Sequence, residues 1–376
     1  MLNVLESVVM KKWYIFCLAV LCVELNVHAI DYEHWMRDLP DELKISHASI
    51  LGTHDAGTAG FSLCGETQKL GIQEQLSGGV RAFDVRAGVY DSSTLLVYHS
   101  ELLHGDNIDQ VFRTLTDFLV THPSECLFVV LKRECGDKNT WNKLMLSCLQ
   151  KYSTFFVDLH KDLTIGEMRG KILLMSRDKY ATNPIGTFFL TGWSDNTTSG
   201  NHIKGTGPYQ MPVRIQDFYE IDGKIEKKKT DIINLLDECA ASTSSNILFI
   251  NHTSGYTYTY YFDSRAVAEC AAACNETVIQ HLEESEGPTG LIMTDFAGKD
   301  QVKYGGKTYD VNGQKLIDCV ISHCYKVAEK LYPSAVETHT DEVEEHDLPV
   351  YDLQGRTITP DSHGLFVVNG KKYLVK

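Results

Sequence analysis

The chain lacks the cysteine spacing of a thiolate zinc site and lacks an excess of positive charge. None of its 11 cysteines stands in a Cys-x-x-Cys pair, so a zinc site of that kind is not expected. Its 35 Lys and Arg are outnumbered by 50 Asp and Glu, which gives a formal net charge of −15. An acidic chain binds nucleic acid poorly and gains little from anionic membranes by bulk electrostatics. A few local cations must therefore bind any anionic substrate.

Familiar hydrolase signatures are also missing. Neither Gly-x-Ser-x-Gly nor His-Glu-x-x-His occurs, so the sequence carries no signature of a serine hydrolase elbow or of a zinc protease helix. The segment Gly305-Gly306-Lys307-Thr308 is similar to part of a P-loop, but Gln301 stands where the first glycine is required. We predict a hairpin there instead.

Apart from one stretch near the N-terminus, the chain has no run that suggests a membrane span. Lys11 and Lys12 precede an apolar run from Trp13 to Cys22, and Val27-His28-Ala29 offers a small-residue cleavage site. The run falls well short of the roughly 20 apolar residues needed to cross a bilayer. We therefore predict that residues 1–29 are a signal peptide, with a membrane anchor as the alternative, and that the protein is secreted or displayed at the cell surface.

Apolar segments alternate with helical ones between residues 30 and 335. Leu127–Leu131, Lys171–Met175 and Leu291–Met293 are continuous apolar runs, typical of parallel strands buried on both faces. Ile108–Thr121 has helical periodicity. This alternation predicts an α/β fold, an irregular TIM-like (βα) barrel, whose functional site lies at the C-terminal rim of the strands.

The C-terminal residues have a different composition. Residues 336–348 are acidic and predict a solvated linker, and residues 349–376 predict a small β appendage. Asn369-Gly370 between apolar runs is a strong hairpin signal. The appendage resembles the C-terminal tails of secreted Bacteroidetes proteins, which implies a secretion-related role. An ordinary β appendage is the alternative.

Polar side chains occur at the ends of four predicted strands. Since the carboxyl ends of parallel strands meet at one rim, we expect these side chains to converge there. Alternation along a strand points Asp84 and Arg86 to the same side, and an inward-facing Arg needs a carboxylate or a bound anion. Taken singly, each has a simpler interpretation as a solvated loop residue or a structural ion pair. The set comprises His54, Asp55, Asp84, Arg86, His99 and Asp295.

These motifs, in this order, resemble the X domain of bacterial phosphatidylinositol-specific phospholipases C. Gly52–Asp55 is similar to the family's Gly-Thr-His-Asp loop, and Phe83–Arg86 to its Phe-Asp-x-Arg strand. His99 follows the arginine at the family's distance. Gln216–Tyr219 is similar to its Gln-Asp-x-Tyr element, and the likeness runs collinearly from about Trp35 to Leu331.

The resemblance implies a mechanism without a metal cofactor. His54 would be the general base that deprotonates the inositol 2-hydroxyl, oriented by Asp295. His99 would be the general acid that protonates the departing diacylglycerol oxygen, and Arg86 would stabilise the phosphoryl oxygens. Asp55 would assist the acid and hold Arg86, and Asp84 would orient the same cluster. The positions that match inositol contacts are Lys132, Arg177, Asp217 and Tyr219, with Trp193 as a rim aromatic.

One departure leaves the acid open. The family's acid histidine is followed by glycine, whereas Ser100 follows His99, and His104-Gly105 lies five residues further on. The distance from Arg86 favours His99, while the local dipeptide favours His104. We retain His99 as the predicted acid, with His104 as its alternative.

Three functions are compatible with this sequence. The first is cleavage of phosphatidylinositol to diacylglycerol and inositol 1,2-cyclic phosphate. The second is a related phosphodiesterase activity on another lipid headgroup or on glycosylated inositol anchors. The third is a non-catalytic surface protein that binds inositol lipids. For the first, we expect transient contact with a membrane containing phosphatidylinositol, no cofactor, no nucleic-acid partner and a monomeric protein.

Overall fold

The computed structural model describes residues 30–61, 65–180, 185–257 and 264–333, and the backbone alone of residues 350–351, 357–358, 364–368 and 371–375. The side chains of Leu103 and His104 are not described. The predicted signal peptide and acidic linker lie outside the described residues. Within the described part of the chain, no helix has the length and apolar character needed to cross a membrane.

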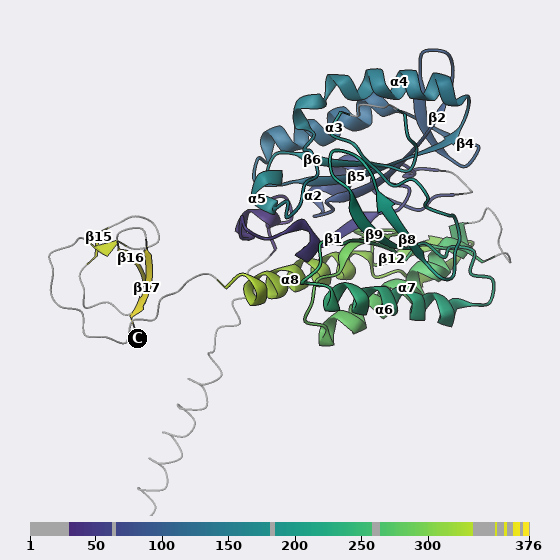
Figure 1. The fold of residues 1–376 in the computed structure, drawn as a ribbon. Helices are drawn as coiled ribbons and strands as arrows, with labels where there is room; N and C mark the ends of the chain where they lie inside the picture. The colour runs from purple at the N-terminus through teal and green to yellow at the C-terminus, as the bar shows by residue number, and fades with distance from the viewer. Residues whose placement is uncertain are drawn as a thin grey trace, which may run out of the picture. The chain divides into compact units, whose positions relative to one another are not determined.

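Nine of the eleven strands of the main sheet form a nearly closed ring, in the order β7-β6-β5-β2-β1-β11-β10-β9-β8 (Figure 1). All neighbours in this order are parallel except β8 and β9, and one antiparallel bridge between Phe189 and Thr206 joins the two ends of the sheet. The predicted TIM-like barrel is therefore confirmed. The ring strands are β1 (Ser49–Thr53), β2 (Ala82–Val89), β5 (Leu127–Cys135), β6 (Ile172–Ser176), β7 (Phe188–Phe189), β8 (Asn201–Gly205), β9 (Met211–Gln216), β10 (Leu248–His252) and β11 (Gly290–Thr294).

Helices cover the outside of the ring. The helix predicted at Ile108–Thr121 is α3, whose N-cap residue Asn107 accepts a hydrogen bond from the backbone N–H of Asp109 at 2.8 Å. Helices α6, α7 and α8 pack side by side, and α8 lies against β1. The α-helices are α2 (Ile72–Ser77), α3 (Ile108–Thr121), α4 (Lys138–Lys151), α5 (Ile165–Met168), α6 (Ile225–Ala241), α7 (Ser264–Glu284) and α8 (Gly313–Leu331).

Strand β3 (Leu95–His99), which ends at the predicted acid, is not part of the ring. It pairs antiparallel with β2 and with β4 (Leu102–Asn107). The connection from β2 is a short turn, closed by a hydrogen bond from Tyr90 N–H to Thr94 O at 3.0 Å. So short a loop can join only antiparallel strands, because parallel neighbours need a long crossover. His99 reaches the rim along this outer meander rather than along a ring strand.

Residues that precede β1 close the N-terminal end of the barrel. Trp35 and Met36 are buried there, and the Trp35 indole N–H donates to Gly79 O at 2.9 Å. Arg81 is fully buried at the start of β2 and forms an ion pair with the equally buried Glu125 at 2.8 Å. Because one end is sealed in this way, the opposite end, where the parallel strands finish, is left for a site.

The C-terminal strands form a four-stranded antiparallel sheet in the order β15-β14-β16-β17. Val368 pairs with Lys371, so β16 and β17 are antiparallel neighbours, and the predicted turn residues Asn369 and Gly370 lie outside the described residues. The hairpin predicted around Gly305 is present as β12 (Gln301–Tyr304) and β13 (Lys307–Asp310). The C-terminal strands are β14 (Val350–Tyr351), β15 (Thr357–Ile358), β16 (Gly364–Val368) and β17 (Lys371–Val375).

Deleting the chain from Val343 onward is expected to leave the barrel folded. The ring is completed by strands that end before residue 295, and α8 ends at Leu331, so no ring strand is lost. Thermal unfolding followed by circular dichroism should give the same midpoint for both lengths within roughly 2 °C, about the shift that 1 kcal/mol causes in a barrel of this size. An insoluble or clearly less stable truncated protein would mean that the appendage completes the core.

Candidate active site

The predicted site residues converge at the C-terminal rim of the barrel. A cavity of about 310 Å³ opens there, and eight of the eleven predicted residues line it. The other three, Asp55, Asp84 and Trp193, each contact residues that do. The eight lining residues are His54, Arg86, His99, Lys132, Arg177, Asp217, Tyr219 and Asp295.

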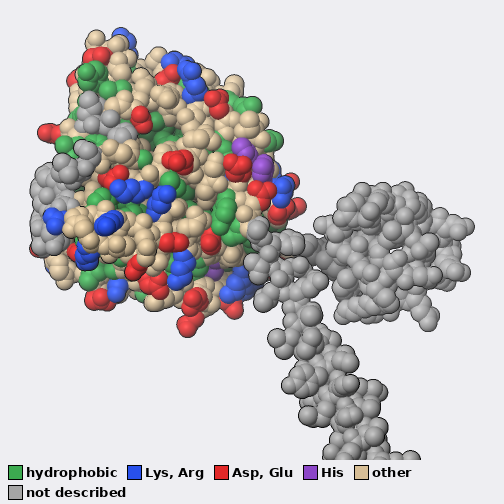
Figure 2. All heavy atoms as spheres, turned by 180° about the vertical axis from the view of Figure 1, so that it is seen from behind, with side chains coloured by type: hydrophobic (Ala, Val, Ile, Leu, Met, Phe, Trp, Pro, Cys, Tyr) green, Lys and Arg blue, Asp and Glu red, His purple; other side chains and the backbone are tan. Residues whose placement is uncertain are grey.

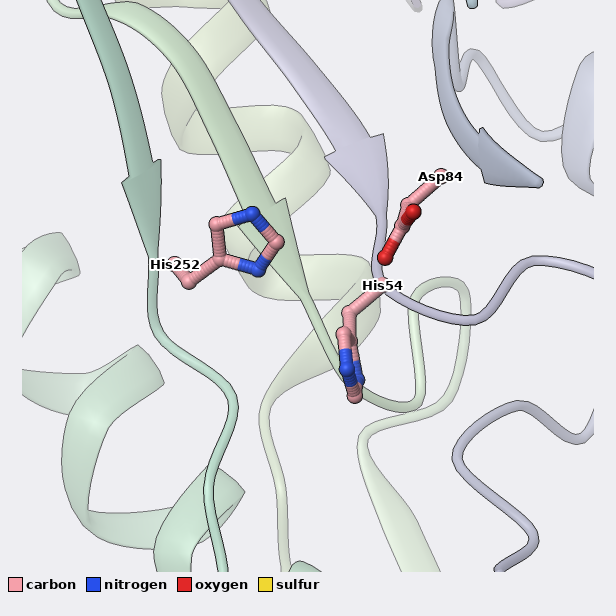
Figure 3. A group of neighbouring side chains, drawn as sticks. All are labelled: His54, Asp84 and His252. Atoms are coloured by element: carbon pink, nitrogen blue, oxygen red, sulfur yellow. The ribbon is translucent and has the colours of Figure 1, made fainter. Parts of the chain in front are cut away.

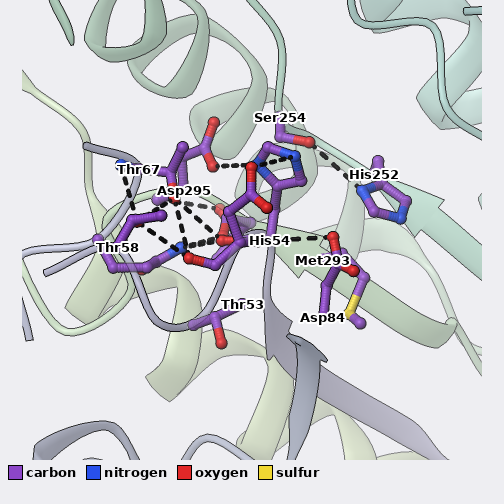
Figure 4. A network of polar contacts seen from close by, with 12 residues as sticks. Thr53, His54, Thr58, Thr67, Asp84, His252, Ser254, Met293 and Asp295 are labelled. Carbon is purple, nitrogen blue, oxygen red and sulfur yellow. Dashed lines mark hydrogen bonds and ion pairs between the residues drawn. The ribbon is translucent and has the colours of Figure 1, made fainter. Parts of the chain in front are cut away.

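Strand register brings His54 and Asp295 together. Thr53 at the end of β1 pairs with Thr294 at the end of β11, so the next residue of each strand projects at the same place. The His54 N–H donates to Thr294 O at 3.0 Å, and His54 Nδ1 lies 2.8 Å from Asp295 Oδ1 (Figure 4). Gln68 fixes this junction, since its Nε2 donates to the carbonyl oxygens of both His54 and Thr294 at 2.8 Å.

Three site residues are each followed directly by a residue with left-handed backbone. Asp55 has φ 45°, Ser100 has φ 57° and Phe296 has φ 57°. This conformation costs a non-glycine residue about 1–2 kcal/mol, so it persists only where the surroundings enforce it, and it is concentrated at functional sites. The resemblance implies a glycine after His99, where Ser100 stands in this chain. Glycine adopts a positive φ more readily than any other residue, which explains that preference.

Asp55 is the centre of the cluster. Its side chain is buried, and its Oδ1 lies 2.8 Å from Arg86 Nε. Its Oδ2 lies 3.3 Å from His99 Nε2 and 3.4 Å from His54 Nε2. One carboxylate therefore faces both imidazoles and the guanidinium at once.

Three carboxylates surround Arg86. Arg86 Nη2 lies 2.9 Å from Asp84 Oδ2, and Arg86 Nη1 lies 3.3 Å from Glu134 Oε1. Burial disfavours the charged guanidinium, but the negative charges of Asp55, Asp84 and Glu134 outweigh burial and hold the pKa of Arg86 well above its ordinary value. Arg86 is therefore a fixed positive charge beside both imidazoles.

The environment of His54 keeps its imidazole neutral. Burial lowers the pKa of His54 well below its ordinary value, and the positive charge of Arg86 lowers it further. Burial raises the pKa of Asp295, and the negative charge of Asp55 adds to that effect. We assign the Nδ1–H tautomer to His54, with Asp295 as acceptor. This tautomer leaves the lone pair of Nε2 available to receive a proton.

His99 is held from its other side. Its Nδ1 lies 2.9 Å from the carbonyl oxygen of Gly65, which can accept a hydrogen bond from the imidazole. Gly65 has φ 79°, and a Cβ at this position would lie 2.1 Å from His99 Nδ1, so only glycine fits. The side chain of His104, the alternative acid, lies outside the described residues.

Charged and aromatic side chains form the wall opposite the histidines. Arg177 pairs with Asp195, and its guanidinium stacks over the Trp193 ring at 4.3 Å from the ring centroid. Trp193 Nε1 donates to Asp217 Oδ2 at 3.1 Å. Burial raises the pKa of Tyr219 to about 12, so its hydroxyl stays protonated at neutral pH. This wall can donate to and accept from a ligand with many hydroxyl groups.

Several residues at the site are not among those predicted from the sequence. His252 at the end of β10 is buried, and its ring lies 5.7 Å from that of His54, centroid to centroid. Burial lowers its pKa to about 4. Glu134, Asp195 and Glu220, unlike His252, line the cavity. The sequence pattern that could indicate His252 is the polar pair Asn251-His252 directly after an apolar run. His54 also follows an apolar run, and it was predicted on that basis.

Residues 42–178 match the family model for "Phosphatidylinositol-specific phospholipase C, X domain". This part of the chain is therefore similar to the phosphatidylinositol-specific phospholipase C X-domain family. The X domain thus includes His54, Arg86, His99 and Lys132, while Asp217 and Asp295 come from the part of the barrel beyond the match.

Two curated relatives carry the name 1-phosphatidylinositol phosphodiesterase. The protein from Listeria monocytogenes is 27% identical over 293 residues, covering 73% of this chain and 84% of the relative. A Staphylococcus aureus protein is 23% identical over 346 residues, covering 83% of this chain and 95% of the relative. The likeness therefore extends beyond the X-domain match to most of the barrel.

Solved structures of phosphatidylinositol-specific phospholipases C share the fold. One from S. aureus superposes with a TM-score of 0.65 at 21% identity, covering 77% of this chain and 97% of that chain. The L. monocytogenes structure superposes with a TM-score of 0.59 at 23% identity, covering 78% of this chain and 99% of that chain. The X domain here thus sits in the same type of barrel.

Proposed function

We propose that this protein cleaves phosphatidylinositol to diacylglycerol and inositol 1,2-cyclic phosphate without a metal cofactor. The observation that carries the proposal is the position of Asp55, whose carboxylate lies within 3.4 Å of His54 Nε2 and 3.3 Å of His99 Nε2 while its other oxygen holds Arg86. Two imidazoles and a guanidinium around one point match the needs of an in-line phosphoryl transfer with separate acid and base.

In the proposed reaction, His54 Nε2 removes the proton of the inositol 2-hydroxyl. The oxygen attacks phosphorus and closes the cyclic phosphate. The bond between phosphorus and the glycerol oxygen breaks, and His99 Nε2 gives a proton to that oxygen. Asp295, 2.8 Å from His54 Nδ1, stabilises the imidazolium that forms on His54. No oxidant, reductant or co-reactant is consumed.

Arg86 is proposed to stabilise the negative charge that develops on the phosphoryl oxygens. A guanidinium presents several N–H donors in a fixed plane, which suits phosphate. Its positive charge is secured by the carboxylates around it. Asp55 and Asp84 then act by orienting Arg86, since their oxygens lie 2.8 and 2.9 Å from its nitrogens.

The inositol ring is proposed to bind against Arg177, Asp217, Tyr219 and Lys132. These side chains line the same cavity as the histidines and supply both donors and acceptors. A ring with several hydroxyl groups can satisfy them, while a headgroup without hydroxyls would leave buried polar groups unpaired. Trp193 acts from behind this wall, because it holds Asp217 and stacks with Arg177.

The proposed partner is a membrane that contains phosphatidylinositol, contacted transiently by a secreted, monomeric enzyme. Acidic and basic side chains are interspersed on the face seen in Figure 2. With a net charge of −15 as well, we expect membrane binding to depend little on anionic lipid. One of the S. aureus structures concerns modulation of that enzyme's membrane binding. Of the aromatic residues between positions 256 and 262, Tyr256 lines the cavity, and Tyr258 to Phe262 lie outside the described residues.

Activity on phosphatidylinositol is expected to survive an excess of chelator. Arg86 occupies the place of the phosphate-binding cation, so removing divalent metal should not remove that contact. The measurement is release of inositol cyclic phosphate from vesicles, followed by ³¹P NMR, with and without EDTA. Loss of activity with EDTA and its return with calcium would contradict the metal-free mechanism. The absence of any cyclic product would contradict the proposed function itself.

The acid limb of the pH profile is expected below pH 6.5. The base must be unprotonated, and burial together with Arg86 lowers the pKa of His54 below its ordinary value of 6.5. Activity should therefore persist as the pH falls through 6.5 and decline only at the lowered pKa. The measurement is kcat/KM between pH 4 and 8 with phosphatidylinositol.

Arg86→Gln is the matched variant for that profile. Removing the positive charge should raise the pKa of His54 and move the acid limb to higher pH, in addition to lowering the rate by about 10²–10³-fold. An acid limb at or above pH 6.5 in the unmodified protein, or one that stays in place in Arg86→Gln, would argue against His54 as the titrating base.

A further inference from the structure

Three side chains at the site, one of them the proposed base His54, offer atoms that could bind a metal ion. One nitrogen each of His54 and His252 and one carboxylate oxygen of Asp84 lie within 4.8 Å of one another. His54 directly follows β1, His252 is the last residue of β10 and Asp84 lies within β2 (Figure 3). The proposed reaction makes no use of His252.

Two of these three side chains have a buried atom without a hydrogen-bond partner among the described residues. His252 is 1% exposed and its Nε2 is unpaired, and Asp84 is 2% exposed and its Oδ1 is unpaired. Unpaired buried polar atoms cost roughly 1–3 kcal/mol each, so such atoms in a native protein call for a ligand or water. The Oδ1 atom of Asp84 stays unpaired, because Arg86 contacts only Oδ2 of that carboxylate.

The local charge can accept a dication. The carboxylates of Asp55, Asp84, Glu134 and Asp295 lie around the site, and the fixed cations that contact them are Arg86 and Lys132. With both histidines neutral and all four carboxylates ionised, the formal balance is two negative charges. The buried carboxylates thus offset the repulsion that Arg86 would exert on a metal ion.

The ligand types select the class of metal. Calcium and magnesium prefer cages of oxygen ligands, whereas two imidazoles and one carboxylate are a typical set for zinc. Zinc binds these ligands at about 2.0–2.2 Å, so the most distant ligand atoms must approach by a small side-chain rotation. Of the three proposed ligands, His54 lines the cavity, so a fourth ligand would reach the metal from that side.

We propose that His54, Asp84 and His252 form an inhibitory site for zinc or a similar borderline transition metal. A metal bound to His54 occupies the nitrogen lone pair that the proposed reaction needs for proton transfer. The metal would therefore be an inhibitor and not a cofactor. The site itself follows from the side-chain geometry, and only its inhibitory effect rests on the proposed function.

The direct test is metal binding to the full chain after chelator treatment. Zn²⁺ titrated into the protein and followed by calorimetry should bind with one high-affinity site per chain. Co²⁺ should give the visible absorption bands of a tetrahedral site with nitrogen and oxygen ligands. His252→Gln should weaken Zn²⁺ binding by more than the roughly 10–100-fold that losing an outer partner of a metal ligand costs. His54→Gln, which changes a residue at the open cavity, should have the same effect.

His160→Gln is the matched control. His160 is an exposed histidine paired with Glu167 at 3.1 Å, an ordinary surface position that could bind metal adventitiously. Zn²⁺ binding should be unchanged in this variant. Equal affinity in His252→Gln and the unmodified protein would overturn the site, as would no high-affinity binding at all. A sulfur-to-cobalt charge-transfer band would also overturn it, because it would assign the metal to cysteine.

The activity assay distinguishes the site from its effect. Zn²⁺ should lower the initial rate on phosphatidylinositol, and EDTA should restore it. A rate unaffected by Zn²⁺ at saturating occupancy would refute inhibition. If the protein cleaves no phosphatidylinositol under any condition, the proposed function is refuted. The metal site is then decided by the binding experiment alone.

Discussion

His99→Ala is expected to lower turnover of phosphatidylinositol by about 10²–10⁴-fold, the range for losing a general acid. The glycerol oxygen is a poor leaving group unless it receives a proton as the bond to phosphorus breaks. His99 is placed for this task, with Nδ1 2.9 Å from Gly65 O and Nε2 3.3 Å from Asp55 Oδ2. The measurement is the single-turnover rate of diacylglycerol release from vesicles.

A change of leaving group separates the acid from the base. An inositol phosphodiester with a nitrophenol leaving group departs without a proton, so His99→Ala should recover most of its rate on that substrate. His54→Ala should stay slow on both substrates, because deprotonation of the 2-hydroxyl is still needed. This pattern assigns each histidine its role and does not follow from a merely structural defect.

His104→Ala is the control for the alternative acid. It should retain nearly full activity, because the proposed acid His99 remains in place. If His104→Ala shows the large loss and the recovery with nitrophenol while His99→Ala stays active, the acid is His104.

The polar residues at strand ends could be predicted from sequence because the parallel barrel has one C-terminal rim. Once the apolar segments before His54 and Asp295 are identified as buried parallel strands, both residues are placed at the same rim, where they lie 2.8 Å apart. The alternation of Asp84 and Arg86 along β2 is likewise a local property. Because these two residues are next neighbours on one face of the strand, their ion pair at 2.9 Å can be expected whatever the rest of the fold.

Other features depend on contacts that the local sequence does not encode. Among the described residues, the ring closes through one bridge, between Phe189 in the two-residue strand β7 and Thr206, which follows the antiparallel strand β8. Strands this short and this irregular leave no periodic signal. His252 cannot be singled out from the sequence, because a lone histidine after a strand is common and only the barrel places it beside His54.

Discrimination between headgroups is expected to be the largest effect of all. The rate on phosphatidylinositol should exceed that on phosphatidylcholine by at least about 10⁴–10⁵-fold, the range for a site that hydrogen-bonds substrate hydroxyls and meets an analogue without them. Asp217 is 2% exposed, with Trp193 Nε1 3.1 Å away and Arg177 Nη1 3.9 Å away. Choline offers no hydroxyl to replace those of inositol. It also lacks the 2-hydroxyl nucleophile, so the cyclising route is closed to it.

Added phosphates on the inositol ring are expected to be rejected by charge. The cavity wall around the ring carries Asp195, Asp217 and Glu220, which would lie close to any phosphate on the ring. Asp195→Asn should partly restore cleavage of the phosphorylated lipid. Asp195 is the more exposed partner of Arg177, so losing its charge frees that guanidinium to bind a phosphate. Mixed vesicles containing phosphatidylinositol, a phosphorylated inositide and phosphatidylcholine allow all three rates to be measured on one surface. Comparable release of phosphocholine would refute both the inositol pocket and the cyclising mechanism, whereas fast cleavage of the phosphorylated lipid alone would refute only the repulsion by this acidic wall.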